Sequence, residues 1–183
     1  MRPRAALVAL LLGASALAQQ PAPPEPPQRD YWADLRAAID RHLGKPYVWG
    51  ATGRKSFDCS GFLWRVMTDT GVFIKRTTAR RYYMCLPKPG EDVVGRFGTV
   101  VFFSDLEHVG IVNDRDTFFH AACTRGTHQA AFDPYWRRRI VGYRAIPAPA
   151  GSGSHAAPSQ PGALGSGATP TPAASPAPAA ARP

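Results

Sequence analysis

The sequence is poor in the patterns that mark metal sites. Its 183 residues contain only three cysteines, Cys59, Cys85 and Cys123, and no CxxC, HxH or HExxH motif. Acidic residues are also scarce, at 13 against 22 lysines and arginines, which gives a formal net charge of +9. A basic balance favours anionic partners. It does not by itself say which kind of anion is bound.

No apolar run reaches the roughly 20 residues that are needed to span a bilayer. The longest, from Ala5 to Ala16, follows Arg2 and Arg4 and ends in small residues up to Ala18, which is the pattern of a cleavable secretory signal. We therefore predict a signal peptide at residues 1–18, no stable membrane anchor, and export to the periplasm or cell envelope. The anionic partners expected there are envelope polymers, with no role for nucleic acid.

Large apolar side chains are nearly absent from two further segments. Residues 19–29 hold five prolines, and residues 147–183 consist almost entirely of Pro, Ala, Gly, Ser and Thr. Such segments cannot bury enough apolar surface to offset their ordering entropy. We predict a linker at 19–29, a disordered tail at 147–183 and one domain at 30–146, which is expected to be monomeric.

The hydrophobic pattern of this domain changes from helical to strand-like. Apolar residues at helical spacing follow Asp30 and again follow Asp58, and Thr77 or Thr78 can cap a short third helix that runs to Met84. Later segments are rich in strand-forming residues, at 99–103, 108–113, 117–121 and 140–145. Helices first and strands later predict an α+β domain, with N-terminal helices packed on an antiparallel sheet.

Two of the predicted strands form a hairpin with one histidine on each strand. A three-residue loop over 113–115 would pair residue 112 with 116 and would set His108 opposite His120. Their Cβ atoms would then lie about 5 Å apart on one face of the sheet. A slip of one residue would place them on opposite faces, so the spacing permits a histidine pair without fixing the register.

Cys59 directly follows Asp58, the predicted cap of the second helix. A helix N-terminus presents free N–H groups and partial positive charge, both of which stabilise a thiolate, and a nearby histidine can accept the thiol proton. We therefore predict Cys59 as a nucleophile, His108 as its base and His120 as the residue that orients His108. Cys85 and Cys123 could pair with each other, which would leave Cys59 as the free thiol.

Each of these residues also has a structural interpretation. A single cysteine is most often a small buried hydrophobe, a strand histidine usually belongs to the core or the surface, and Asp58 caps a helix in any case. A zinc ion held by Cys59, His108, His120 and one water is a further alternative. The combination of all three residues favours thiol catalysis over these alternatives.

Several segments, in their order and spacing, resemble the NlpC-type family of cell-wall cysteine peptidases. They are Tyr47-Val48-Trp49-Gly50, Phe57-Asp58-Cys59-Ser60-Gly61-Phe62, Val101-Phe102-Phe103, His108-Val109-Gly110-Ile111 and Phe119-His120-Ala121. A later stretch, Asp133-Pro134-Tyr135-Trp136 followed by Arg139 and Arg144, is similar to the Spr-like branch of Gram-negative envelopes. The resemblance covers residues 30–146.

The resemblance implies a papain-like fold and the catalytic set Cys59, His108 and His120. It also implies substrate contacts from Tyr47, Asp58 and Ser60. Members of the family cut peptidoglycan stem peptides at γ-D-glutamyl–diaminopimelate bonds or at D-alanyl–diaminopimelate cross-links, and the thiol mechanism needs no metal or organic cofactor. We expect a secreted peptidoglycan endopeptidase with a slight preference for the cross-link. An exported enzyme meets intact wall, in which the L-alanine amine of the stem is acylated.

Two alternatives come from other functional classes. The domain could be a non-catalytic module that binds the cell wall with the same fold, although a missing cysteine or histidine would be expected in that case. The same thiol could also serve an acyl or amide transferase, which nothing in the sequence distinguishes from a hydrolase.

Overall fold

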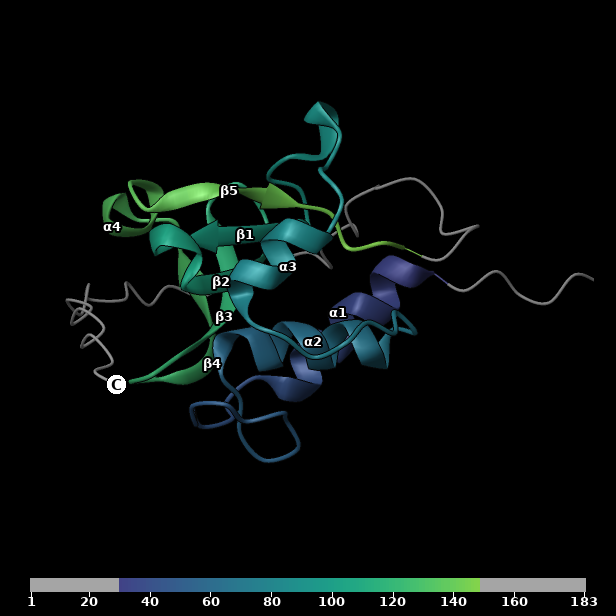
Figure 1. Cartoon of the computed structure of the whole chain (residues 1–183), viewed down its shortest axis with the longest axis vertical. Helices are drawn as coiled ribbons and strands as arrows, with labels where there is room; N and C mark the ends of the chain where they lie inside the picture. Colours follow the sequence, from purple (N-terminus) through teal and green to yellow (C-terminus); the bar gives the residue numbers. More distant parts are fainter. Residues whose placement is uncertain (1–29, 149–183) are drawn as a thin grey trace, which may run out of the picture.

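The computed structural model describes residues 30–148, in which three helices come first, a five-stranded antiparallel sheet follows, and a fourth helix precedes the last strand (Figure 1). The helices are α1 (Tyr31–His42), α2 (Cys59–Asp69), α3 (Ala79–Cys85) and α4 (Pro134–Arg137). The strands are β1 (Val100–Phe103), β2 (His108–Val112), β3 (Thr117–Ala122), β4 (Gly126–Ala131) and β5 (Ile140–Arg144). They lie in the order β4-β3-β2-β1-β5. This arrangement confirms the predicted α+β class.

Side-chain caps begin three helices where the sequence predicts them. Asp30 accepts two backbone N–H groups of α1, Asp58 accepts one from α2, and Thr78 accepts one from α3. Of the two candidates for the third cap, Thr77 and Thr78, the structure therefore uses Thr78. A cap of this kind typically contributes about 1 kcal/mol. The Asp58 cap makes Cys59 the first residue of α2.

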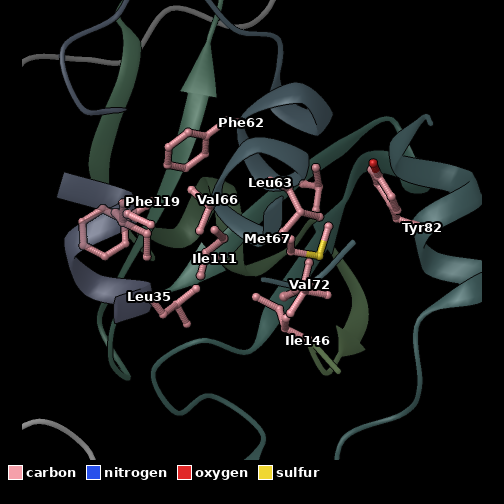
Figure 2. Close-up of a cluster of buried hydrophobic side chains, with 14 of the residues drawn as sticks. Leu35, Phe62, Leu63, Val66, Met67, Val72, Tyr82, Ile111, Phe119 and Ile146 are labelled. Carbon is pink, nitrogen blue, oxygen red and sulfur yellow. The ribbon is translucent and has the colours of Figure 1, made fainter. Parts of the chain in front are cut away.

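One face of the sheet is covered by α1 and α2, and their shared core holds the helix that carries Cys59. Figure 2 shows side chains of α2, β2 and β3 that gather in this core, namely Phe62, Leu63, Val66, Met67, Ile111 and Phe119. Each is at most 1% exposed, and burying a side chain of this size contributes about 1.5–3 kcal/mol. The α2 members of this set, Phe62, Leu63, Val66 and Met67, recur at helical spacing, so one face of α2 packs on the sheet and holds the N-terminus of the helix in place.

The opposite face of the sheet carries a second apolar cluster. Along β1, Val101 and Phe103 point into it, while their neighbours point to the α2 side, as alternation in a strand requires. Trp136 of α4 packs on this cluster. Neither α4 nor β4 is predicted from the sequence, because α4 is only one turn long and β4 contains few strand-forming residues.

The β2–β3 hairpin has a wider turn than the three-residue loop considered from the sequence. Val112 pairs with Phe118, not with residue 116, so the register that was left open differs by two residues from the one that this loop would give. The Asp114 carboxylate accepts hydrogen bonds from the Asp116 N–H at 2.8 Å and the Thr117 hydroxyl at 2.9 Å. This local bonding stabilises a longer turn. A shift of two keeps every side chain on its face, so both histidines still point to one side.

Three of the predicted segments lie wholly or almost wholly outside the described residues. They are the signal peptide at 1–18, the linker at 19–29 and, except for residues 147 and 148, the tail at 147–183. Between residues 30 and 148, none of the helices has the length and apolar character needed to cross a bilayer.

Candidate active site

Cys59 lies at the N-terminus of α2 against the backbone of β2. It is 7% exposed, and its thiol donates to the carbonyl of Glu107 at 3.9 Å. The backbone N–H of Val109 also points to the sulfur. Glu107 and Val109 flank His108, so the structure brings the predicted nucleophile beside the strand segment that carries the predicted base. Within residues 30–148, no hydrogen bond joins the Cys59 sulfur to the His108 ring.

The resting Cys59 side chain is a neutral thiol. Burial raises the pKa of this thiol to about 12, and the negative charge of Asp58 adds to the rise. The N–H groups of Val109 and Ser60 and the charge of Arg76 favour the thiolate, as does the helix N-terminus, which typically contributes 0.3–1 kcal/mol. The loss of hydration outweighs all of these effects.

The Asp58 carboxylate accepts five hydrogen bonds from four residues. The donors are the Gly61 N–H at 2.6 Å, the Ser60 hydroxyl at 2.9 Å, the Gly50 N–H at 3.0 Å, and the Arg76 guanidinium at 2.7 and 2.8 Å. Arg76 also donates to the Ser60 hydroxyl at 3.0 Å. The buried charge of Asp58 is therefore balanced inside the protein, and its oxygen lone pairs are all used.

Tyr47 is held next to α2 by its neighbours in the chain. Two backbone hydrogen bonds, both 3.1 Å long, join residues 46–48 to Phe57. The phenol hydrogen-bonds to the thiol of Cys123, and burial, with the nearby thiols of Cys59 and Cys123, raises the pKa of Tyr47. Tyr47 therefore keeps its proton and can donate a hydrogen bond beside Cys59.

Three histidines form a row that crosses three strands. Nε2 of His108 lies 2.8 Å from Nδ1 of His120, and Nε2 of His120 lies 3.3 Å from Nε2 of His128. His128 faces His120 directly across the β3–β4 ladder. Its own Nδ1 lies 3.0 Å from the carbonyl oxygen of Gly126. The structure thus brings His108 and His120 into contact and adds a third ring that the sequence analysis did not identify.

The apolar surroundings keep His108 and His120 uncharged. The ring of Trp136 stacks on His108 at 5.3 Å between centroids and 28° between planes. Burial lowers the pKa of His108 to about 4. Burial also lowers the pKa of His120 well below its ordinary value, and the neighbouring histidines add to this effect. At neutral pH both rings are neutral, so His108 has the protonation state that a general base needs.

A strained turn leads the chain into β2. The short 3₁₀ helix η2 (Ser104–Leu106) has positive φ at all three residues, with values of 50°, 55° and 71°. Arg80 of α3 donates to the carbonyl of Asp105 at 2.8 Å and holds this turn in place. Left-handed backbone at residues other than glycine costs about 1–3 kcal/mol each and occurs preferentially at functional sites.

Two alternatives raised by the sequence find no support in the structure. Cys85 and Cys123 are both free and exposed, so the pairing that was left open is not formed. Between residues 30 and 148, no group of three or more His, Cys, Asp or Glu side chains could hold a metal ion. In the histidine row, the nitrogens contact one another and do not converge on a common point, which disfavours a zinc site.

Four residues of this site are not predicted from the sequence, namely Arg76, Cys123, His128 and Trp136. Arg76 lies 18 positions from Asp58 in a segment without periodicity. His128 could have been found only by predicting β4, since pairing with β3 is what sets it opposite His120.

Comparisons with known proteins agree on one family. Residues 44–145, more than half of the chain, match the NlpC/P60 family. The probable peptidoglycan endopeptidase LytE of Bacillus subtilis is 32% identical over 104 residues, which cover 55% of this chain and 30% of LytE. The chain thus spans less than a third of this relative.

Two solved structures share the fold. A Staphylococcus aureus protein, described as similar to a lipoprotein of the NLP/P60 family, has a TM-score of 0.56 and 24% identity, over 68% of this chain and 45% of that one. RipD of Mycobacterium tuberculosis, described as a non-catalytic NlpC/p60 domain protein adapted to peptidoglycan binding, has a TM-score of 0.52 and 14% identity, over 64% and 97%. Placement in the Spr-like branch stays a prediction.

Breaking the Asp58–Arg76 ion pair should destabilise the domain strongly. Arg76→Met leaves a mostly buried carboxylate without its counter-charge, which costs about 3–5 kcal/mol. The double variant Asp58→Asn/Arg76→Met should recover much of this loss, because no charge is left unpaired. Arg137→Met is a matched control, since its partner Asp116 is exposed, and it should cost less than about 1 kcal/mol. Urea unfolding followed by circular dichroism measures all three, and equal costs for Arg76→Met and Arg137→Met would contradict the argument.

Stability should fall as the pH is lowered from about 6.5. His120 and His108 have lower pKa values in the folded than in the unfolded chain, so the unfolded chain binds more protons in this range. Their contribution is present above pH 6.5 and is lost as the pH falls through the folded pKa, by up to about 1.4 kcal/mol per pH unit for each histidine. His120→Gln should make the free energy of unfolding less steep between pH 6.5 and 4.5. An unchanged slope would show that His120 does not titrate as its burial requires.

Proposed function

The chain belongs to the NlpC/P60 family, and from that premise we propose that it is a secreted cysteine endopeptidase that hydrolyses peptidoglycan stem peptides. One observation carries the proposal. Cys59 begins α2 with its sulfur against the backbone on both sides of His108, and His108 is hydrogen-bonded to His120. The similarity to LytE supports the substrate class. The signal-like segment at 1–18 supports action in the periplasm or cell envelope.

The proposed reaction runs through a thioester. The Cys59 sulfur attacks the scissile carbonyl as its proton passes to His108, and His108 then protonates the amine that leaves. In the second half, His108 takes a proton from water, the hydroxide attacks the thioester, and the proton returns to the Cys59 sulfur. Because Nε2 of His108 is occupied by His120, the proton moves through Nδ1. Contacts between a nucleophile and its base commonly tighten only when substrate is bound.

Two donors are available for the oxyanion. The backbone N–H of Cys59 makes no hydrogen bond to any residue between 30 and 148, so it is free to donate to a negative charge that develops beside the Cys59 sulfur. The protonated phenol of Tyr47 lies close to the same sulfur. We assign both groups to oxyanion stabilisation, which gives Tyr47 a defined contact with the substrate.

The surroundings of Asp58 favour cleavage in polymeric wall. A peptidase that requires a free L-alanine amine could bind that amine with a carboxylate. Here Arg76 already balances the charge of Asp58, and the lone pairs of its oxygens are used. An incoming amine would have to displace the guanidinium. We therefore assign Asp58 and Ser60 to shaping the floor of the substrate site, and we favour the D-alanyl–diaminopimelate cross-link over the γ-D-glutamyl bond.

The thiol mechanism predicts a distinct pattern among substitutions. Cys59→Ala should reduce hydrolysis of purified sacculi by at least about 10³-fold while the thermal unfolding curve changes little. The exposed Cys85 provides the control, and Cys85→Ala should stay active. His108→Gln should be as inactive as His108→Ala, because an amide cannot carry the proton. His120→Gln should retain more activity than His120→Ala.

Inactivity of the wild-type chain in this assay, with tight binding to sacculi, would support a wall-binding module in place of an enzyme. Loss of activity in Cys85→Ala with retention in Cys59→Ala would overturn the assignment of the nucleophile.

The bond preference can be checked on the digestion products. Cross-link cleavage should lower cross-linked dimers and raise intact tetrapeptide monomers, measured by chromatography and mass spectrometry of muropeptides. A stem peptide with a free L-alanine amine should be cut no faster than the same peptide with that amine acylated, because Asp58 cannot accept the amine. Release of diaminopimelate-containing fragments that leave L-alanyl-D-glutamate on the glycan would instead assign the γ-D-glutamyl bond.

A further inference from the structure

The row of histidines ends at a group that can only accept a hydrogen bond, the carbonyl of Gly126. We propose that His128 is a positioning residue. Its hydrogen bond to this carbonyl fixes which of its nitrogens carries the proton, and the hydrogen bonds through His120 then fix the position of the proton on His108. The result is a neutral His108 with its proton on Nε2 and a bare Nδ1 for the thiol proton of Cys59. The inference deepens the proposed function, on which the role of His108 as a base rests.

The hydrogen bonds along the row fix the position of each ring proton in turn, starting at His128. A carbonyl has no proton, so Nδ1 of His128 carries the proton of the 3.0 Å contact with Gly126. In its neutral form an imidazole carries one N–H, and in that form Nε2 of His128 is bare and accepts from Nε2–H of His120 at 3.3 Å. Nδ1 of His120 is then bare and accepts from Nε2–H of His108 at 2.8 Å. The remaining nitrogen of His108, Nδ1, has no proton.

The opposite placement of the ring protons is unfavourable at His128, the last histidine of the row. If Nδ1 of His108 held the proton, His120 would donate from Nδ1 and His128 would donate from Nε2. Nδ1 of His128 would then be bare, and its lone pair would face the lone pairs of the Gly126 carbonyl. His120, which is 1% exposed, keeps a hydrogen bond at both ring nitrogens in either order, so the contact of His128 with Gly126 decides between the two orders.

The carbonyl that sets the direction is itself held in place. Gly126 has φ of +66°, and a Cβ at this position would lie 2.0 Å from the carbonyl oxygen of Lys45. The next residue, Thr127, exchanges backbone hydrogen bonds of 2.8 Å with Lys45 and Gly44. The start of β4 is thus fixed to the segment that leads to Tyr47, and the Gly126 carbonyl cannot turn away from His128 without breaking these contacts.

The direct test is the tautomer of each ring. Long-range proton–nitrogen NMR spectra of the full chain carrying Cys59→Ala, at pH 7, distinguish Nδ1–H from Nε2–H in a neutral imidazole. We expect Nδ1–H at His128 and Nε2–H at both His120 and His108. A proton on Nδ1 of His108 would overturn the proposal. Because the sample lacks the nucleophile, this result does not depend on activity.

Substitutions at His128 test the positioning role. His128→Leu removes the acceptor for His120, so the His108 signal should show a mixture of tautomers and kcat should fall about 10–100-fold with little change in KM. His128→Gln keeps an acceptor oxygen and should stay within a few-fold of the wild type. Gln129→Leu, at the exposed neighbouring position of β4, should behave as the wild type does.

Two outcomes separate this inference from the proposed function. An unchanged His108 tautomer in His128→Leu would overturn the positioning role even if the wild type is a peptidase. If the tautomers are as expected but the wild-type chain hydrolyses nothing, the proposed function is wrong and the positioning of His108 by His128 still holds. If His128→Leu fails to fold, the spectrum of the Cys59→Ala chain still decides the matter, because a proton on Nδ1 of His108 or on Nε2 of His128 would overturn the proposal.

Discussion

The ion pair between Asp58 and Arg76 is the interaction on which the geometry of the site depends. The carboxylate joins three separate parts of the chain, namely the loop at Gly50, the first turn of α2 and the connection that leads to α3. A charge in so buried a position needs its partners present together, because removing one of them leaves the others unsatisfied. Cys59 is the next residue along the chain, so its location follows from how this carboxylate is held.

The burial that strengthens this ion pair also keeps the reacting groups neutral. Cys59 holds its proton and His108 lacks one, so the resting site is not a preformed thiolate–imidazolium pair. Proton transfer from Cys59 to His108 then takes place only during the reaction, when a substrate carbonyl is bound and the oxyanion donors can stabilise the negative charge on its oxygen. Such a site exposes little reactive thiolate to the environment, which suits the exported enzyme proposed above.

The parts of the structure that could be predicted are those set by local contacts. Asp30 and Asp58 act through N–H groups two or three residues away, and the apolar stripe of α2 repeats with the helical period. The hairpin could be predicted but its register could not, since side chains within the turn, Asp114 above all, decide the turn's length. Arg76 and His128 could not be predicted, because each acts on a partner that lies beside it only after the sheet and the loops have formed.

The hairpin's two-residue shift has a consequence for how such domains can vary over evolutionary time. A slip of two residues in the pairing of β2 with β3 preserves which way each side chain of the two strands points, whereas a slip of one reverses one strand relative to the other. Insertions and deletions in the turn between Val112 and Thr117 should therefore be tolerated when the pairing stays as it is or slips by two, and lost when it slips by one. The turn lies on the surface, yet the contact between His108 and His120 limits which of its changes can be inherited.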